Sequence, residues 1–249
     1  MEIMLELNKK IKLKSIKSFG IEVECGIYES ALYDIENDYY GDYNFEHGED
    51  GSVSVEDPRY EDDCWISNCE LRYWSENVDD VIEFIKVCWE KGIKQNYTCG
   101  NHVHFRPRDE WWPVYLSPLF PRFFVFQYLK KYNQKKKYMN RLFSRYSRYT
   151  IFSLKRMLDI FVLREDFDRY KFINYVSFFE DQWTIEIRIM PYCSSVKEHL
   201  EQLMFIIKTI KMFEKLVEKK SRNVFVKSFD IKTEKLENEL EMKIYETGG

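Results

Sequence analysis

Four short stretches of this chain carry polar and apolar side chains in alternation, and their polar side chains are rich in acids and histidines. Alternation with period two is typical of a β-strand with one apolar and one polar face. The stretches cover residues 17–26, 65–74, 99–107 and 182–190. If they share one sheet, a single face carries Glu22, Glu24, Glu70, His102, His104, Glu186 and Arg188.

This set of side chains could bind metal ions together with a phosphate. Carboxylate oxygens and imidazole nitrogens from several strands suit hard divalent ions such as Mg²⁺ or Mn²⁺. Two of the four histidines of the chain, His102 and His104, lie within one tripeptide. Arg188 lies two residues from Glu186, and a planar guanidinium favours phosphate oxygens. The combination predicts metal-assisted phosphate chemistry.

Helices must flank these strands, and helical periodicity is clearest over residues 194–219, where apolar residues recur at three-to-four spacing. Further helices are expected over 77–91, ended by Gly92, after Pro121, over about 153–163 and over 232–243. The mixed order of strands and helices predicts an α+β fold with helices on the apolar face of an antiparallel sheet. We find no repeat and no linker, and therefore expect a single domain over residues 1–249, with a C-terminal helical segment over 194–249.

Composition excludes several classes of protein. Of the 249 residues, 45% are hydrophobic and 32% charged, with only 9 Gly and 6 Pro, which excludes a disordered or low-complexity chain. No apolar run approaches the roughly 20 residues that cross a bilayer, and the first residues lack the order of a signal peptide. We therefore expect a cytoplasmic protein with no membrane partner. The six cysteines form no CxxC pair, so we expect buried thiols.

Charge is distributed unevenly, although the net charge is only −4. Between Asp34 and Asp63, 12 acids accompany the single base Arg59, which predicts a polar, loop-rich insertion. Between Lys130 and Arg156, 10 bases occur with no acid. Such a run is usually a solvated helix face, but the tyrosines within it leave nucleic-acid binding open.

The order of six motifs resembles that of the amidoligase family, a compact branch of the carboxylate-amine ligases related to glutamine synthetase and glutamate-cysteine ligase. The motifs are FGIEVE (19–24), DGS (50–52), CEL (69–71), CGNHVHF (99–105), RYKFIN (169–174) and TIEIR (184–188). The Cys-Gly-x-His-Val-His and Thr-Ile-Glu-x-Arg segments are the specific ones. The resemblance covers residues 19–192, and implies a curved antiparallel sheet, as in the glutamine synthetase catalytic domain, whose concave face holds ATP and two or three Mg²⁺ or Mn²⁺ ions.

The same resemblance implies roles for individual residues. The implied metal ligands are Glu22, Glu24, Glu70, His102 and Glu186. The implied nucleotide-binding residues are His104, Arg106 and Arg188, and the implied catalytic residues are His102, Glu186 and Arg188. After Glu70 the chain departs from the Glu-Leu-Val-Ser-Pro segment of the family and reads Leu71, Arg72, Tyr73, which is compatible with an altered substrate or with an inactive descendant.

The preferred interpretation is an ATP- and Mg²⁺-dependent ligase that joins a small-molecule or peptide carboxylate to an amine through an acyl phosphate. One alternative is a metal-dependent nuclease or phosphoesterase that uses the basic stretch over 130–156 as a nucleic-acid track. Another is a non-catalytic binding or structural protein that keeps the scaffold, for instance one carried by a virus or plasmid. The simplest alternative is a polar sheet face that only contacts solvent.

Overall fold

We describe a computed structural model, in which residues 13–55, 66–117, 119–142, 144, 172–175 and 183–219 are placed. The helices expected over 153–163 and 232–243 lie outside the described residues, as do Cys64 and residues 145–156 of the basic stretch.

The core of the fold is one six-stranded sheet, in the order β2-β3-β1-β4-β6-β5, and every neighbouring pair is antiparallel. The strands are β1 (Ile16–Tyr28), β2 (Phe45–Glu49), β3 (Ile66–Ser75), β4 (Gly100–Pro107), β5 (Ile173–Asn174) and β6 (Ile185–Pro191). The four stretches with period-two alternation are therefore β1, β3, β4 and β6. They occupy the four central positions of the sheet, so the α+β prediction is confirmed.

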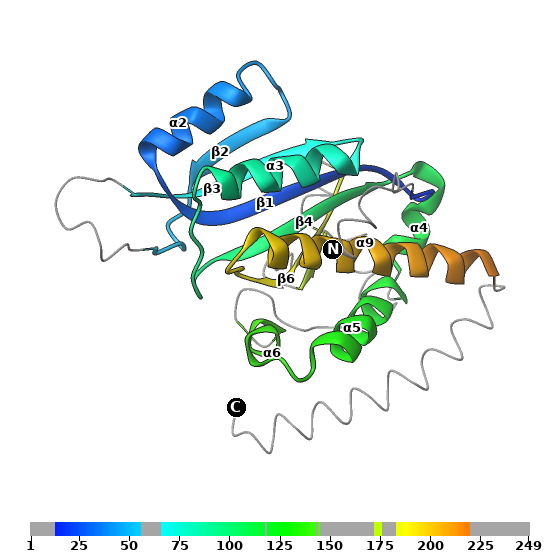
Figure 1. Cartoon of the computed structure of the whole chain (residues 1–249). Coiled ribbons are helices and arrows are strands. Elements are labelled where there is room, and N and C mark those ends of the chain that lie inside the picture. The colour runs from blue at the N-terminus through cyan, green and yellow to red at the C-terminus, as the bar shows by residue number, and fades with distance from the viewer. Residues whose placement is uncertain are drawn as a thin grey trace.

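Helices surround this sheet, with α3 and α9 over one of its faces (Figure 1). In chain order they are α2 (Glu29–Asp38), α3 (Val78–Glu90), a short 3-10 turn (Asp109–Trp111), α4 (Trp112–Tyr115), α5 (Leu119–Tyr132), α6 (Lys136–Leu142) and α9 (Val196–Lys219). The predicted helix over 77–91 is α3: the Asn77 side chain accepts the backbone N–H of Asp79 at its start, and Gly92 follows its end with φ +85°, a backbone conformation that glycine adopts without strain.

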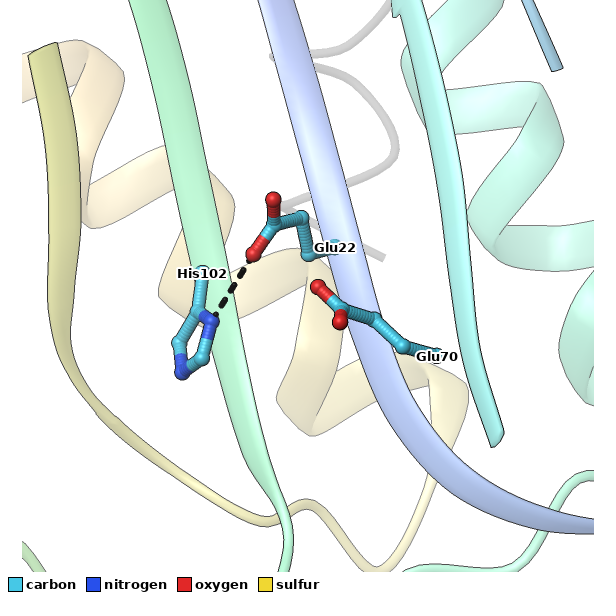
Figure 2. A group of neighbouring side chains, drawn as sticks. All are labelled: Glu22, Glu70 and His102. Atoms are coloured by element: carbon cyan, nitrogen blue, oxygen red, sulfur yellow. Dashed lines mark hydrogen bonds and ion pairs between the residues drawn. The ribbon is translucent and has the colours of Figure 1, made fainter. Parts of the chain in front are cut away.

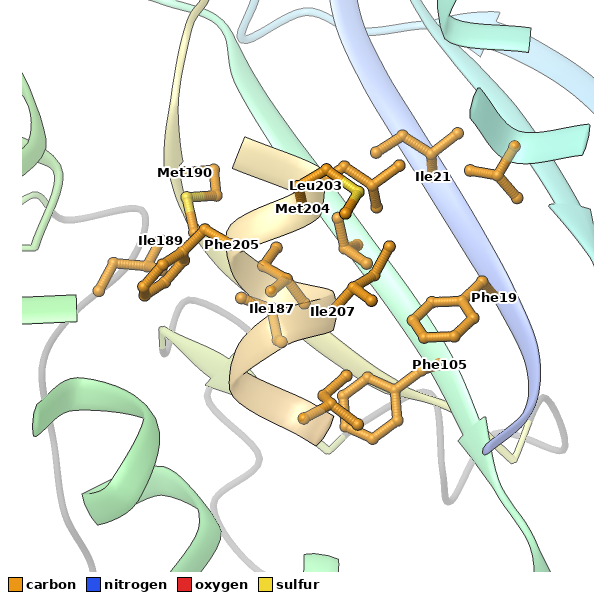
Figure 3. Packing of buried hydrophobic residues seen from close by; sticks show 14 of the residues in the cluster. Phe19, Ile21, Phe105, Ile187, Ile189, Met190, Leu203, Met204, Phe205 and Ile207 are labelled. Atoms are coloured by element: carbon orange, nitrogen blue, oxygen red, sulfur yellow. The ribbon is translucent and has the colours of Figure 1, made fainter. Parts of the chain in front are cut away.

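The hydrophobic core fills the space between the sheet and the long helix α9 (Figure 3). Ile21 of β1, Phe105 of β4 and Ile187 of β6 are buried there with Leu203 and Ile207 of α9. Because successive side chains of a strand point to opposite faces of the sheet, the polar side chains of these strands lie on the face away from α9. Packing on one face thus decides which side of the sheet carries the acids and histidines.

The prediction of a loop-rich insertion over 34–63 is confirmed in part for its described residues, since 39–44 and 50–55 are turns and loops, but the segment also contains the end of α2 and all of β2. Helix α2 buries Ile35 completely, while the acids around it face outwards. Strand β2 is held by its backbone ladder to β3, a contact that composition does not reveal. Residues 56–63 of this insertion lie outside the described residues.

Two further expectations concern cysteines and membranes. All five described cysteines (Cys25, Cys69, Cys88, Cys99 and Cys193) are free and buried, as expected. None of the helices in the described ranges has both the length and the apolar character needed to span a bilayer.

Candidate metal centre

The register of the central strands brings the predicted polar residues together on the sheet face opposite α9. Glu22 of β1 lies between Arg72 of β3 and His102 of β4. One step along, His104 lies opposite Glu186 of β6, and Glu24 lies opposite Glu70. These contacts join strands far apart in sequence and follow directly from the antiparallel pairing.

A cavity of about 920 Å³ opens over this face. All eight residues to which the sequence assigned a role line it, together with Glu46, Asp50, Gly51, Ser52, Arg72, Trp74, Arg141, Asn174 and Thr184. The Asp50-Gly51-Ser52 motif forms a turn in which the Asp50 carboxylate accepts the Ser52 backbone N–H (2.8 Å) and hydroxyl (2.7 Å).

Glu22 lies at the centre of the cluster. Its Oε2 is 3.0 Å from His102 Nδ1, the contact drawn in Figure 2, and its Oε1 is 2.9 Å from His104 Nε2. Burial alone would raise the pKa of Glu22, but the charge of His104 and the hydrogen bond with His102 outweigh burial and lower the pKa well below its usual value. Glu22 is therefore an anion that contacts the imidazoles of both His102 and His104.

Two groups of ligand atoms share Glu22, and each is compact enough for one metal ion. In the first group, atoms of Glu22, Glu70 and His102 lie within 4.8 Å of one another, and in the second the same holds for Glu22, His104 and Glu186. Each group offers two carboxylates and one imidazole, a donor set that suits Mg²⁺ or Mn²⁺. In both groups the three donors come from three different strands.

One observation fits a metal better than a closed hydrogen-bond network. His104 Nε2 is buried and, among the described residues, makes no hydrogen bond of proper geometry, although Glu22 Oε1 lies only 2.9 Å away. A buried imidazole nitrogen is normally satisfied. An ion between Glu22 and His104 would give this nitrogen a partner.

The acids of the cluster crowd one another. Burial and the neighbouring Glu22 carboxylate raise the pKa of Glu70 to about 8, although Arg72 opposes that rise with an ion pair of 2.9 Å to Glu70. Burial alone would lower the pKa of His104, but the charges of Glu22 and Glu186 outweigh burial and raise it to about 9. Near neutral pH, Glu70 and His104 therefore keep their protons, which reduce the net negative charge of the cluster.

Glu24 occupies a different position from the other predicted ligands. It is 5% exposed, its Oε2 accepts the backbone N–H of Gly100, and its Oε1 lies 3.4 Å from His102 Nε2. It belongs to neither of the two ligand groups. The structure therefore places Glu24 behind His102, on the side of the ring away from Glu22.

The predicted nucleotide-binding arginines lie at the cavity wall. Arg188 is paired with Glu186 Oε1, while Asn174 donates to Glu186 Oε2 at 2.7 Å, so both oxygens of Glu186 are held. Arg106 lies two residues beyond His104 on β4 and opposite Ser18. Both arginines line the same cavity as Glu22.

Arg141 of α6 is a site residue that sequence reasoning missed. It is 7% exposed, its Nη2 lies 3.3 Å from His102 Nε2, and its Nε donates to the Arg188 carbonyl at 3.3 Å. Burial lowers its pKa, against the opposing charge of Glu24. Arg141 falls within the basic stretch that was expected to be a solvated face, and nothing in its own neighbourhood of the sequence distinguishes it.

The described part of the basic stretch gives little support to base stacking. Tyr132 and Tyr138 are buried and stack on each other at a centroid distance of 4.0 Å, and Lys135 lies 5.6 Å from the centre of each ring. Rings buried in this way are not available to nucleotide bases. Tyr146 and Tyr149 lie outside the described residues.

Comparison of the chain with protein-family models, with curated proteins and with solved structures gave no significant match.

Proposed function

We propose that this protein is a cytoplasmic ATP- and Mg²⁺- or Mn²⁺-dependent carboxylate-amine ligase with a fold like the glutamine synthetase catalytic domain. The observation that carries the proposal is the pair of ligand groups that share Glu22 on the floor of a cavity of about 920 Å³. The motif order shared with the amidoligases supports the choice of ATP and of amide-bond formation.

The residues present fit two divalent cations. Glu70 and His102 would hold one ion with Glu22, and His104 and Glu186 would hold the other. Bound there, the cations would neutralise the oxygens of a triphosphate and stabilise the charge that develops on the transferring phosphoryl group.

The bond-forming steps take place between the substrates, and Arg188 would stabilise the transferring phosphoryl group. A substrate carboxylate attacks the γ-phosphorus of ATP, and ADP leaves with the electron pair of the broken bond. An amine then attacks the acyl phosphate and expels inorganic phosphate, which leaves an amide and a proton. Arg188 would bind the phosphoryl oxygens, because Glu186 orients its guanidinium over the same side of the cavity.

Nucleotide binding is tested by thermal denaturation. A ligand that binds only the folded state stabilises it by mass action, so ATP with Mg²⁺ should raise the melting temperature, and ATP in EDTA should not. The Glu22→Gln variant keeps the side-chain size and should lose the effect. An equal shift with and without Mg²⁺, or in both proteins, would contradict the metal assignment.

The reaction is tested by product analysis. ADP and phosphate should appear only when ATP, Mg²⁺ and a carboxylate substrate are all present, and hydroxylamine should trap the acyl phosphate as a hydroxamate. Because the substrate is unidentified, a pool of amino acids and short peptides serves as the first probe. Phosphate release that does not depend on any carboxylate would contradict the ligase assignment.

A second candidate is a two-metal nuclease or phosphoesterase, favoured by the carboxylate of Glu22 that joins the two ligand groups. Two ions held close together are a common device for in-line displacement at phosphorus. Cleavage of nucleic acid with Mn²⁺ alone, abolished in the His102→Ala variant, would select this candidate over the ligase. A scaffold without catalysis would instead show neither reaction.

A further inference from the structure

Each of the two ligand groups on the cavity floor has an arginine beside its outermost carboxylate. On β3, Arg72 lies two residues beyond Glu70 and forms an ion pair of 2.9 Å with it. On β6, Arg188 lies two residues beyond Glu186 and is paired with it in the same way. The proposed function gives a role to Arg188 and leaves Arg72 without one.

The two arginines lie on opposite sides of the ligand groups. Strands β1 and β4 separate β3 from β6 in the sheet, so the backbones that carry Arg72 and Arg188 are about 14 Å apart at the usual strand spacing. Both side chains line the cavity. A carboxylate-amine ligase must hold two anions that repel each other, a triphosphate and a carboxylate, and this arrangement provides one guanidinium for each.

Arg72 has donors available for such an anion. Its Nη2 donates to Glu70 Oε2 at 2.9 Å, and this is the one hydrogen bond that the side chain makes to the described residues. Its Nε is buried and has no hydrogen-bond partner among them, although Glu22 Oε1 lies 3.7 Å away. The side chain is 39% exposed, so a ligand in the cavity can reach it, and the planar guanidinium fits a carboxylate.

The charges around the cavity explain why an anion would bind there together with the metals. Six acids and four arginines line the cavity, so the metal-free site has two negative charges in excess when every carboxylate is ionised and the histidines are neutral. Two divalent cations reverse this excess to two positive charges. They would also engage Glu22 and Glu70, the carboxylates that now face Arg72. An anion beside Arg72 would then compensate its charge.

We propose that Arg72 binds the carboxylate of the substrate beside the ion held by Glu22, Glu70 and His102, on the side of the metal centre away from Arg188. The proposal rests on the metal sites of the proposed function, and names the residue that selects the carboxylate substrate. Arg72 also stands where the Glu-Leu-Val-Ser-Pro segment of the amidoligases has valine. The contact would therefore distinguish the substrate of this chain from substrates of proteins with that segment.

Paramagnetic broadening measures this contact without any turnover, because Mn²⁺ bound to the protein broadens the NMR signals of a small molecule held beside it. The probe is ¹³C-labelled acetate, with acetamide as the uncharged control, and the protein is in excess over Mn²⁺. Acetate should be broadened and acetamide should not. In Arg72→Gln the affinity for acetate should fall roughly tenfold or more, because hydrogen bonds between charged groups are lost. Equal binding of acetate by Arg72→Gln and the parent would overturn the proposal.

Further variants and a second probe separate the two arginines. Arg72→Lys keeps the charge but not the planar pair of donors, and should bind acetate with an affinity between those of the parent and Arg72→Gln. Arg108→Leu, which removes an exposed arginine, should change nothing. Inorganic phosphate, followed by ³¹P NMR, should be weakened mainly by Arg188→Gln. A greater loss of phosphate than of acetate in Arg72→Gln would make Arg72 a phosphate-binding residue and overturn the proposal.

Titration calorimetry distinguishes this role from one in which Arg72 only holds Glu70 in place. Arg72→Gln should still bind two Mn²⁺ ions, at least as tightly as the parent, because a positive charge beside Glu22 and Glu70 is removed. Loss of an ion, or weaker binding, would reduce Arg72 to a support for Glu70 and overturn the proposal.

The outcomes for this inference and for the proposed function are separate. Acetate held by Arg72 in a protein that forms no amide would contradict the proposed function alone. An active ligase whose KM for its carboxylate substrate is unchanged in Arg72→Gln would contradict this inference alone.

Discussion

Gly100 is the residue whose replacement tests the site most directly. A Cβ at this position would lie 2.2 Å from Arg141 Nη2, 2.9 Å from its Cζ and 3.1 Å from His102 Nε2. Ordinary contacts begin near 3.4 Å, so in Gly100→Ala the guanidinium must move by at least 3.4 − 2.2 = 1.2 Å. A shift of that size breaks the contact of Arg141 with His102, and strains its hydrogen bond to the Arg188 carbonyl.

The expected cost follows from these contacts. A hydrogen bond of a charged group contributes roughly 1.5–3 kcal/mol, and alanine in a strand is favoured over glycine by roughly 0.5–1 kcal/mol. The net loss in the free energy of unfolding for Gly100→Ala is therefore about 1–2 kcal/mol. For a chain of this size that lowers the melting temperature by roughly 2–8 °C.

Thermal denaturation in EDTA, followed by circular dichroism, measures this loss, and Gly48→Ala is the matched control. Gly48 also lies in a strand of the sheet, and a Cβ there meets no atom of the described residues within 4 Å, so its replacement should be neutral or slightly stabilising. In an Arg141→Leu background the obstacle is smaller, and Gly100→Ala should cost less. A Gly100→Ala protein that melts no lower than the parent would refute the reasoning.

Three further predictions concern the charged cluster. Glu22→Gln should bind no Mn²⁺ in titration calorimetry, because Glu22 belongs to both ligand groups. Glu70→Gln and Glu186→Gln should each bind one ion, since each of these residues belongs to one group. Two ions bound to Glu22→Gln would contradict the assignment of Glu22 as a shared ligand. In EDTA the melting temperature should fall between about pH 6 and pH 9, since the raised pKa values of Glu70 (about 8) and His104 (about 9) make the folded state bind more protons than the unfolded state. Glu70→Gln should reduce that fall, and an unchanged profile would argue against the raised pKa of Glu70. Arg188→Lys should lower kcat at saturating ATP by at least tenfold with little change in nucleotide affinity, because lysine cannot donate to two phosphoryl oxygens with the geometry of a guanidinium. Turnover within twofold of the parent would exclude a role of Arg188 in phosphoryl transfer.

The positions of the strands and of most site residues could be predicted from the sequence, because period-two alternation alone decides which side chains share a face. It cannot distinguish Glu22 from Glu24, since both point to the same side. The difference arises from the neighbouring strand, where His102 lies opposite Glu22 and Gly100 donates to Glu24.

Arg141 could not be predicted for a different reason. It reaches the site from α6, a helix of seven residues whose placement depends on tertiary packing rather than on any local pattern. Two of its partners, His102 and the Arg188 carbonyl, are 39 and 47 residues away in sequence. Gly100 in β4 leaves room for the Arg141 guanidinium, because a Cβ at this position would collide with it. The reason for a glycine at this position cannot be recognised from the sequence alone.

The protonation of the metal-free cluster is itself an argument for cations. Burial and the neighbouring Glu22 carboxylate raise the pKa of Glu70, whereas burial lowers the pKa of His104 and the carboxylates of Glu22 and Glu186 raise it beyond that loss. Both groups therefore keep a proton because carboxylates lie beside them. These protons offset part of the negative charge in the absence of a metal. A divalent ion in either group would displace the proton of the group it occupies, because a ligating carboxylate or imidazole must give up its proton. Metal binding should therefore compete with protons at Glu70 and His104, and become tighter as the pH rises from 6 towards 9.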